Sequence, residues 1–463
     1  MTDSPEQNLP VGRNLKIGLF HLGSGMADVI STGIWNRIMI SDLGFSATPI
    51  GLLVSLRYFL APLGVWAGRM SDRHQIGGYR RLFWVWLGRA MMVISIALLG
   101  LMTAHIARGG DATPLVWLVI TVSLLLFSLG SAFSGSTFLA LIYDRAAPGQ
   151  RGRAVGIVWT FLLLGFTVGG VLFGLLLPSS SEGGPHALGF SPDTLQNLFL
   201  IGALVMGGLW FFSVVGEERR GAPAETAAAE AKPSSLKDDL KLAWNNPRTR
   251  FFFWYLALSM MFAFSQDLIL EPFAGDVFGM EARVTTRFAA YWGSMAILGT
   301  LVFLWLSRRY KRLNNTVMSY IGVTVLVVTF ALFGVASLAG VRGLVTPGLI
   351  LLGIGLGVWN VGTLGLMMEM SPFGRAGTFL GFWTLVVTLA RGVGVSGGGI
   401  VRDVALSLTG ADHALSYAVV FLLGAAGLGA ALWALSRVRA GVFQVEQGDS
   451  EISAERVFAG ALD

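Results

Sequence analysis

Long apolar segments recur along the whole chain and alternate with short polar connections. A helix of about 20 apolar residues crosses the roughly 30 Å hydrocarbon core of a bilayer, so this pattern predicts transmembrane helices. We count twelve such segments, with approximate bounds 14–40, 47–67, 82–104, 114–140, 154–177, 196–215, 251–272, 288–307, 316–338, 344–368, 376–400 and 414–436. The predicted fold class is all-α, a polytopic membrane protein with twelve transmembrane helices.

Composition supports this fold class. The 463 residues are 54% hydrophobic and only 13% charged, whereas soluble proteins carry about 25% charged residues. The chain has no cysteine, which excludes disulfides and thiol chemistry. No phosphate-binding loop, HExxH motif or nucleophile–base pattern is present, so we expect a protein that is not an enzyme.

The basic residues predict the orientation. Of 33 lysines and arginines, 24 lie on the side shared with both termini. The positive-inside rule therefore places both termini in the cytoplasm. The net charge of +6 lies on this rim, so it needs no nucleic-acid partner to explain it.

The spans divide into two halves around a polar connector. We predict an N-terminal six-helix half (1–215), a cytoplasmic linker (216–250), a C-terminal six-helix half (251–436) and a cytoplasmic tail (437–463). Within the linker, capping-box spacing and apolar periodicity over 235–247 predict a short amphipathic helix at the membrane surface, with a plain tether as the alternative.

The two halves echo each other. The stretch PGQRGRAVGIVWT (148–160) aligns without gaps on PFGRAGTFLGFWT (372–384). Basic turns also follow the second and the eighth spans. Six spans plus six, with matching turns on one side, resemble the plan of the major facilitator superfamily.

The turn after the second span, GRMSDRHQIGGYRR, is similar to the signature of that superfamily. The resemblance implies a close helix approach at Gly68 and a gating latch at Asp72, which would face a helix N-terminus in the other half. The alternative is a merely solvated basic turn. The gating motif consists of Gly68, Asp72, Arg73, Arg80 and Arg81.

Longer stretches resemble one branch, the bacteriochlorophyll delivery family, whose members assist assembly of light-harvesting complexes in photosynthetic bacteria. The resemblance runs through both halves and leaves the linker and the tails uncovered. The most telling pieces are Asn36-Arg37-x-Met39, Ala61-Pro62-Leu63 and Gly399-x-x-Arg402-Asp403.

This resemblance implies bacteriochlorophyll as cargo and a bacterial inner, photosynthetic membrane as location. The implied partners are light-harvesting antenna polypeptides or a nascent antenna or reaction-centre complex, with pigment-synthesis enzymes as further candidates, besides the lipid bilayer. Two alternatives stay open. One is an ion-coupled transporter of a small solute, and the other is a chaperone that binds antenna polypeptide but no pigment.

Four charged groups are predicted to pair inside the membrane. An isolated charge at mid-bilayer costs at least a few kcal/mol, so such groups pair or face water. Asp28 and Arg57 lie at similar depth on the first two spans, and Asp267 and Arg391 on the seventh and eleventh. The Asp28–Arg57 pair has a functional reading, in cavity gating or headgroup contact, and a purely structural one, and Asp267 with Arg391 is a second candidate pair.

The first span carries the other candidate residues for the cavity or the pigment. His21, Asp28 and Trp35 lie seven residues apart and so share one helix side, followed by Asn36 and Arg37. Neutral imidazole could be the axial ligand of a chlorin magnesium at His21, and a hydrogen-bonded histidine within the bundle is the alternative. No protein-held metal site is predicted.

Two further charged residues in or near the spans are expected to reach water. Glu271 lies near the outer end of the seventh span and is expected to be hydrated. Arg89 lies about 10 Å inside the third span, from where its side chain could extend to the cytoplasmic interface.

Overall fold

The computed structural model describes residues 9–179, 189–218, 220, 244, 247–310, 312–370 and 376–438. These residues form helices and connecting turns, with one isolated bridge between Ile76 and Tyr79. Ten helices in this part of the chain are long and apolar enough to cross a membrane. The predicted all-α membrane fold is confirmed, whereas the amphipathic helix predicted in the linker lies almost wholly outside the described residues.

The contacts divide the described chain into two compact units. The first unit includes the chain up to residue 220 and also Leu268–Gly293. Its helices are α1 (Val11–Asp28), η1 (Val29–Ile34), α2 (Trp35–Arg37), η2 (Ile38–Asp42), α3 (Ala47–Phe59), α4 (Pro62–Arg73), α5 (Leu82–Ala107), α6 (Pro114–Arg145), α7 (Arg151–Leu176), α8 (Pro192–Val214), α11 (Leu270–Phe278) and α12 (Ala282–Thr286).

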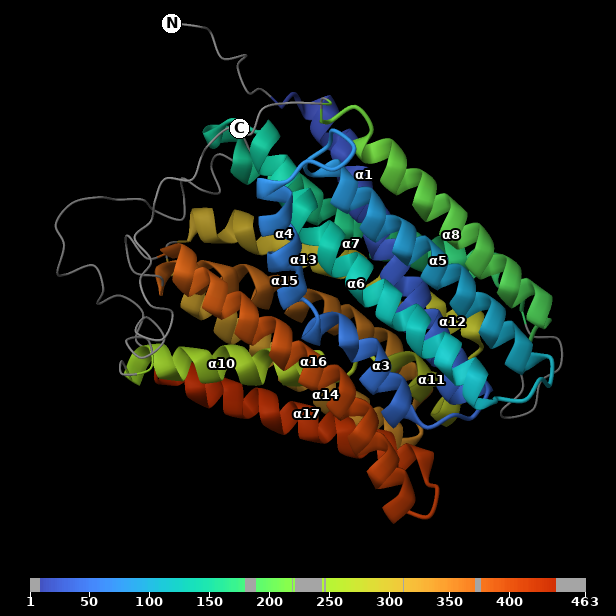
Figure 1. Cartoon of the computed structure of the whole chain (residues 1–463). Coiled ribbons are helices and arrows are strands. Elements are labelled where there is room, and N and C mark those ends of the chain that lie inside the picture. Colours follow the sequence, from blue (N-terminus) through green and yellow to red (C-terminus); the bar gives the residue numbers. More distant parts are fainter. Residues whose placement is uncertain are drawn as a thin grey trace, which may run out of the picture. The chain divides into compact units, whose positions relative to one another are not determined.

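In the first unit, α1 packs on α7 and α8, while α5 packs on α6 and α8 (Figure 1). Small residues allow the closest approach. A Cβ atom at Gly25 would lie 2.3 Å from the Leu162 carbonyl oxygen, and one at Gly165 would lie 2.4 Å from that of Leu22. The backbones of α1 and α7 are therefore in direct contact, as is common between membrane helices.

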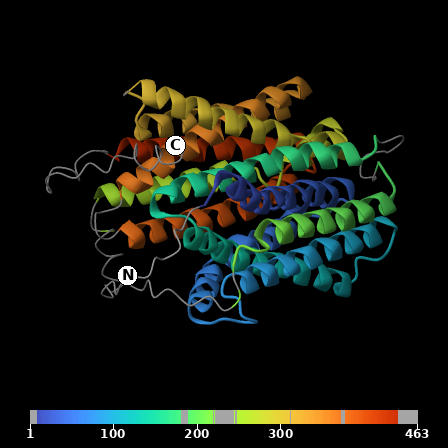
Figure 2. The ribbon, with the colours of Figure 1, turned by 90° about the horizontal axis from the view of Figure 1, so that it is seen from above.

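The second unit contains the remaining helices. In it, α14 lies beside α15 and α17, and α10 lies beside α16 and α17 (Figures 1 and 2). The bounds are α10 (Pro247–Ala263), α13 (Phe288–Arg309, whose first turns belong to the first unit), α14 (Asn315–Ala339), α15 (Val345–Glu369), α16 (Ala376–Leu408) and α17 (His413–Ser436).

The first predicted span is not a regular α-helix throughout. After α1, the segments η1 and η2 are π-helical. The Ser31 hydroxyl donates to the Ala27 carbonyl and the Thr32 hydroxyl donates to the Asp28 carbonyl, each four residues back. Such bonds compete with the backbone ladder, and π-helical turns often occur at functional sites.

The seventh predicted span is broken. Helix α10 ends at Ala263, a turn follows, and α11 begins at Leu270. Pro272 has no N–H group, and its ring would clash with the carbonyl four residues earlier, so a regular α-helix is disfavoured at this point. The second span has a similar break before Pro62, the first residue of α4.

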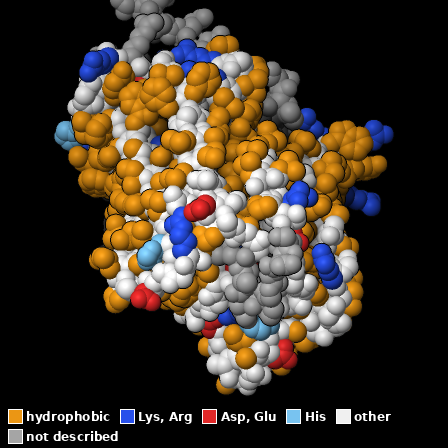
Figure 3. All heavy atoms as spheres, turned by 90° about the vertical axis from the view of Figure 1, so that its right-hand side faces the viewer, with side chains coloured by type: hydrophobic (Ala, Val, Ile, Leu, Met, Phe, Trp, Pro, Cys, Tyr) orange, Lys and Arg blue, Asp and Glu red, His pale blue; other side chains and the backbone are white. Residues whose placement is uncertain are grey.

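Large apolar side chains cover much of the outside. Figure 3 shows one face on which hydrophobic side chains extend over wide areas between scattered charges. Leu175 on α7 and Leu204 and Phe211 on α8 are all exposed. Exposed apolar surface of this extent fits contact with lipid.

Candidate functional site

Asp28 and Arg57 form the ion pair that the sequence predicts. Arg57 Nη1 lies 2.5 Å from Asp28 Oδ1, and Arg57 also donates to the Tyr58 hydroxyl. The side chains are 12% and 24% exposed for Arg57 and Asp28. Asp28 is the last residue before the π-helical segment η1, so the pair lies where the first span departs from regular geometry.

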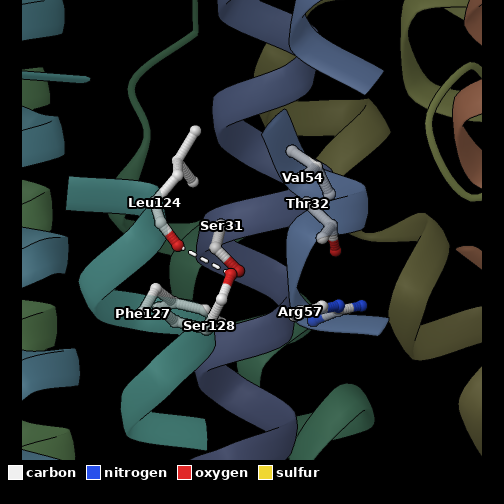
Figure 4. Close-up of a pocket in the computed structure, with 7 residues that line it drawn as sticks. All are labelled: Ser31, Thr32, Val54, Arg57, Leu124, Phe127 and Ser128. Atoms are coloured by element: carbon white, nitrogen blue, oxygen red, sulfur yellow. Dashed lines mark hydrogen bonds between the residues drawn. The ribbon is translucent and has the colours of Figure 1, made fainter. Parts of the chain in front are cut away.

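A small pocket lies beside this pair (Figure 4). Its volume is about 10 Å³, which is room for about one water molecule. Hydroxyl groups and the guanidinium supply the polar part of its wall. The lining residues are Ser31, Thr32, Val54, Arg57, Leu124, Phe127 and Ser128.

Breaking the Asp28–Arg57 pair from one side is expected to cost more than removing it whole. Asp28→Asn or Arg57→Gln should each destabilise the protein by about 2–3 kcal/mol, somewhat below the cost for a fully buried pair because water reaches part of Asp28. The double variant should cost less than the sum. Thermal unfolding of the wild type, both single variants and the double variant in detergent measures these losses. If the loss in the double variant equals the sum of the two single losses, the two residues are not coupled.

His21 on α1 lies among aromatic rings. Its side chain is 9% exposed. The imidazole stacks on Phe138 with ring centroids 5.1 Å apart, and it meets Trp159 edge-on at 5.8 Å. Nδ1 is buried and has no hydrogen-bond partner among the described residues. The hydrogen-bonded alternative is therefore not seen, while the proposed role as a metal ligand stays a prediction.

Arg89 on α5 does not reach the interface as expected. Its side chain is buried, and the guanidinium carbon lies 4.0 Å from the centre of the Phe20 ring and 4.7 Å from that of Trp210. Cation–π contact explains why the side chain stays inside. The expectation for Glu271 is also wrong, because this residue is buried at the start of α11.

Trp35 and Asn36 are both fully enclosed. Trp35 Nε1 donates to the Thr103 hydroxyl on α5 at 3.0 Å. The amide oxygen and nitrogen of Asn36 have no hydrogen-bond partner among the residues that the structure describes. Trp35 thus has a packing role, and the place of Asn36 in a cavity stays a prediction.

Arg37 holds the outer part of the first span to the segment after the break. Its Nη1 lies 2.7 Å from Asp42 Oδ1, and its Nη2 donates to the Met280 carbonyl at 3.0 Å. A Cβ atom at Gly275 would lie 2.3 Å from the guanidinium carbon, so any side chain there would push Arg37 out of its present position. These contacts explain why Leu268–Gly293 groups with the first unit and not with the rest of the predicted half 251–436.

The predicted gating motif forms a charged cluster. Asp72 pairs with Arg81, and Asp144 accepts from Arg80 and Arg81, each at 3.0 Å. Arg73 is exposed at the end of α4. The latch between halves stays a prediction, since the Asp72 contact described here lies within the first unit.

The close helix approach expected at Gly68 is found one turn earlier, at Gly64. A Cβ atom at Gly68 would be 3.9 Å from its nearest neighbour, the Ser136 hydroxyl oxygen, which is ordinary van der Waals contact. At Gly64, one turn earlier, it would be 2.7 Å from the Ala132 carbonyl oxygen. Helix α4 is therefore closer to α6 at Gly64 than at Gly68.

Sequence reasoning missed the acidic partners of these basic residues, Asp144 in the charged cluster and the pair Glu217 and Glu218 after the sixth span. The Glu218 carboxylate accepts from the backbone N–H groups of Arg80, Arg81 and Leu82 at the start of α5. Glu217 pairs with Arg13 at 2.7 Å and with Lys16 at 3.2 Å. An acidic pair directly after the sixth span, opposite a basic turn, was the signal that could have revealed this contact.

Asp72→Asn tests the latch. If Asp72 stabilises one arrangement of the halves, its neutralisation should change the labelling of single cysteines introduced on the predicted cytoplasmic side, and the cysteine-free chain offers a clean background. Water reaches the Asp72 side chain, which is 56% exposed, and the buried Arg81 keeps Asp144 as a second partner, so we expect a stability loss of only about 0–1 kcal/mol. Unchanged labelling in a well-folded variant would argue against the latch.

The second predicted pair is also present. Arg391 Nη2 lies 2.9 Å from Asp267 Oδ2, and Gln266 donates to the other carboxylate oxygen at 2.6 Å. The guanidinium carbon of Arg391 lies 3.9 Å from the centre of the Phe264 ring. Like Asp28, Asp267 lies where its span is interrupted. In each half a carboxylate therefore lies at or directly before the irregular part of the first span.

The architecture defines a class of protein, the polytopic membrane proteins with the major facilitator fold. The nucleoside transporter NupG gives a TM-score of 0.68 at 15% identity, covering 93% of this chain and 99% of that one. A bacterial homologue of the human lysosomal transporter Spinster gives 0.66 at 17%, covering 95% and 100%. At these identities the likeness concerns the fold alone.

The sequence then identifies the family. Residues 34–443 match the model of the PUCC protein family, so the chain belongs to that family. It is 28% identical over 415 residues to Protein PucC of Rhodovulum sulfidophilum, covering 87% of each chain. It is 29% identical over 389 residues to the "Bacteriochlorophyll synthase 44.5 kDa chain" of Rhodobacter capsulatus, covering 82% of this chain and 84% of that one. The family resemblance predicted from the motifs is confirmed.

Proposed function

We propose that this protein is an assembly factor for photosynthetic light-harvesting or reaction-centre complexes, and that it binds bacteriochlorophyll and delivers it to antenna polypeptides. Membership of the PUCC family and the name of the Rhodobacter relative support a role in photosynthetic assembly. We place it in the inner, photosynthetic membrane of a bacterium, with both termini in the cytoplasm. Antenna polypeptides or nascent complexes would be its partners, alongside pigment-synthesis enzymes.

The observation that carries pigment binding is His21. A buried imidazole nitrogen without a hydrogen-bond partner is costly, and a metal centre would satisfy it. When bound, the chlorin supplies a magnesium ion with an open axial position, and neutral imidazole is a suitable ligand for it. The residues present thus fit the pigment chemically.

Access to His21 requires side-chain movement. Phe138 lies over the imidazole and Trp159 lies at its edge. The pocket near Asp28 holds about one water, whereas even a drug-sized ligand needs about 300 Å³ or more. Phe138 and Trp159 must therefore rotate before a macrocycle can reach His21, and the same flat rings can then pack against it.

In this proposed role the protein binds and delivers the pigment and makes or breaks no covalent bond in it. The ion-coupled transporter remains the second function, because both carboxylates lie at interrupted spans, where transporters of several folds bind substrates and coupling ions. An antenna chaperone without pigment is the third. If the protein is an ion-coupled transporter, replacing Asp28 should alter solute uptake. The same replacement should leave any pigment spectrum unchanged.

The absorption spectrum of the protein tests the proposal. Purified gently from a host that makes bacteriochlorophyll, the wild-type protein should carry the pigment, with a visible and near-infrared spectrum. The same protein from a host without the pigment, loaded afterwards, controls for adventitious uptake during extraction. A well-folded but colourless protein in both preparations would overturn pigment carriage.

A further inference from the structure

Two half-buried arginines form a cationic pair at α12. Arg283 lies in this helix, and Arg287 directly follows it with helical backbone angles, so one helical turn separates the two residues. Residues four apart on a helix lie on one face, and two like charges there repel each other. Neither arginine forms an ion pair with a carboxylate among the described residues, and Arg283 Nε is buried without a hydrogen-bond partner there. The described part of the chain therefore supplies no anion to this pair.

The end of α7 holds the pair in place. Gly174 lies in the last turn of α7, and a Cβ atom there would be 2.7 Å from Arg287 Cγ and 3.2 Å from the Arg283 carbonyl oxygen. Arg287 Nη2 donates to the Gly174 carbonyl at 3.5 Å, which is long for a hydrogen bond. A neutral carbonyl at this distance does not balance the charge of a guanidinium. The Arg287 stem is thus fixed against α7, while the positive charge of the pair stays available to a ligand.

An exposed apolar strip of α7 ends beside the same arginines. The strip consists of Val171, Leu172, Leu175 and Leu176, whose side chains are all exposed. Its last two residues directly follow Gly174, which contacts Arg287. Apolar surface that ends at a pair of cations matches the two parts of a phospholipid, its hydrocarbon chains and the phosphate at their end.

We propose that Arg283 and Arg287 bind the phosphate group of an anionic phospholipid whose chains lie along the exposed strip of α7. Guanidinium groups bind phosphate oxygens through charge-assisted hydrogen bonds, and a bound phosphate removes the repulsion between the two cations. Binding of a headgroup at the membrane surface needs no enclosed cavity. The predicted orientation puts this end of α7 at the outer surface, so the lipid belongs to the outer leaflet. The proposal is independent of pigment binding.

Lipid titration of the full-length protein tests the proposal. Delipidated protein in detergent would be titrated with phosphatidylglycerol and followed by native mass spectrometry and by the thermal midpoint, which a ligand of the folded state raises. The wild type should bind phosphatidylglycerol more tightly than diacylglycerol, which lacks the phosphate. Arg283→Gln and Arg287→Gln should each lower the affinity for phosphatidylglycerol by about tenfold, because each removes a charge-assisted contact. Arg287→Lys should keep part of the affinity.

Two controls separate lipid binding from folding. Arg108→Gln removes an arginine that caps α5 at an end also predicted to face outside, but this arginine already pairs with Asp193. It should bind phosphatidylglycerol as the wild type does. Without lipid, Arg283→Gln should unfold at the same temperature as the wild type or higher, because it removes one of two like charges that repel each other.

Three results would overturn the proposal. The first is equal affinity for phosphatidylglycerol in the wild type and both glutamine variants. The second is an equal rise in the thermal midpoint with inorganic phosphate alone, which would assign the pair to a soluble anion. The third is a lower midpoint of lipid-free Arg283→Gln that Glu182→Gln reproduces. Glu182 follows α7 in the sequence and lies outside the described residues, and this result would make a carboxylate of the chain itself the partner.

Discussion

Replacing Arg37 by glutamine is expected to destabilise the protein by about 3–5 kcal/mol. The Arg37 and Asp42 side chains are only 6% and 10% exposed, so the variant leaves a buried carboxylate without its guanidinium. It also removes the donor to the Met280 carbonyl and opens the space against Gly275. The loss should appear as a lower thermal midpoint in detergent and as faster proteolysis of the segment 268–293.

The comparison with a surface arginine makes this test specific. Arg108 pairs with Asp193, but both side chains are well exposed, so Arg108→Gln should cost about 0–1 kcal/mol. The double variant Arg37→Gln with Asp42→Asn should recover part of the loss, because it removes both charges. Equal midpoints for Arg37→Gln and Arg108→Gln would show that the buried pair does not hold this end of the first unit.

The two intramembrane pairs could be predicted because the membrane makes lone charges costly. Few other charged residues lie at the same predicted membrane depth as Asp28 and Arg57, or as Asp267 and Arg391, so each residue had few possible partners. Arg89 escaped this reasoning, because a cation near a helix end can also extend to water. Only the placement of Phe20 and Trp210 shows that it stays buried, and apolar periodicity does not carry that information.

The interruptions of the spans were harder to predict. Hydropathy reports how apolar a segment is and not how its backbone is hydrogen-bonded, so spans one and seven were predicted as continuous. The signals were local. Ser31 and Thr32 bond back to the preceding turn, and Pro272 removes one backbone N–H donor from the helix. Such residues are often tolerated in regular membrane helices, so they indicate an interruption without requiring it.

Apart from the two intramembrane ion pairs, the contacts between residues distant in sequence were not predicted. Glu218 reaches the start of α5, more than 130 residues earlier, and Arg37 reaches Met280. The predicted division at the linker follows chain order, but Leu268–Gly293 packs with the first unit. The positions of charged residues in the sequence show which of them need a partner of opposite charge. Where several such partners are available, only the fold shows which one is in contact.

His21→Leu is expected to remove most of the bound pigment while leaving the fold intact. Leucine fills a similar space between Phe138 and Trp159 but offers no lone pair to magnesium. Loss of an axial bond worth about 1.4 kcal/mol or more should lower pigment affinity by about tenfold or more. Pigment absorbance per mole of purified protein measures this, with the thermal midpoint as the check on folding.

The matched control is His105→Leu, which removes an exposed histidine near the end of α5. It should leave pigment content unchanged, so that a loss in His21→Leu alone assigns the ligand to the buried imidazole. Wild-type colour in His21→Leu would place the ligand elsewhere, with a water or a backbone carbonyl as the next candidate. Because His21 has no hydrogen-bond partner among the described residues to lose, a purely structural role predicts little change from leucine in either readout. The pigment measurement therefore separates a ligand from a packing residue.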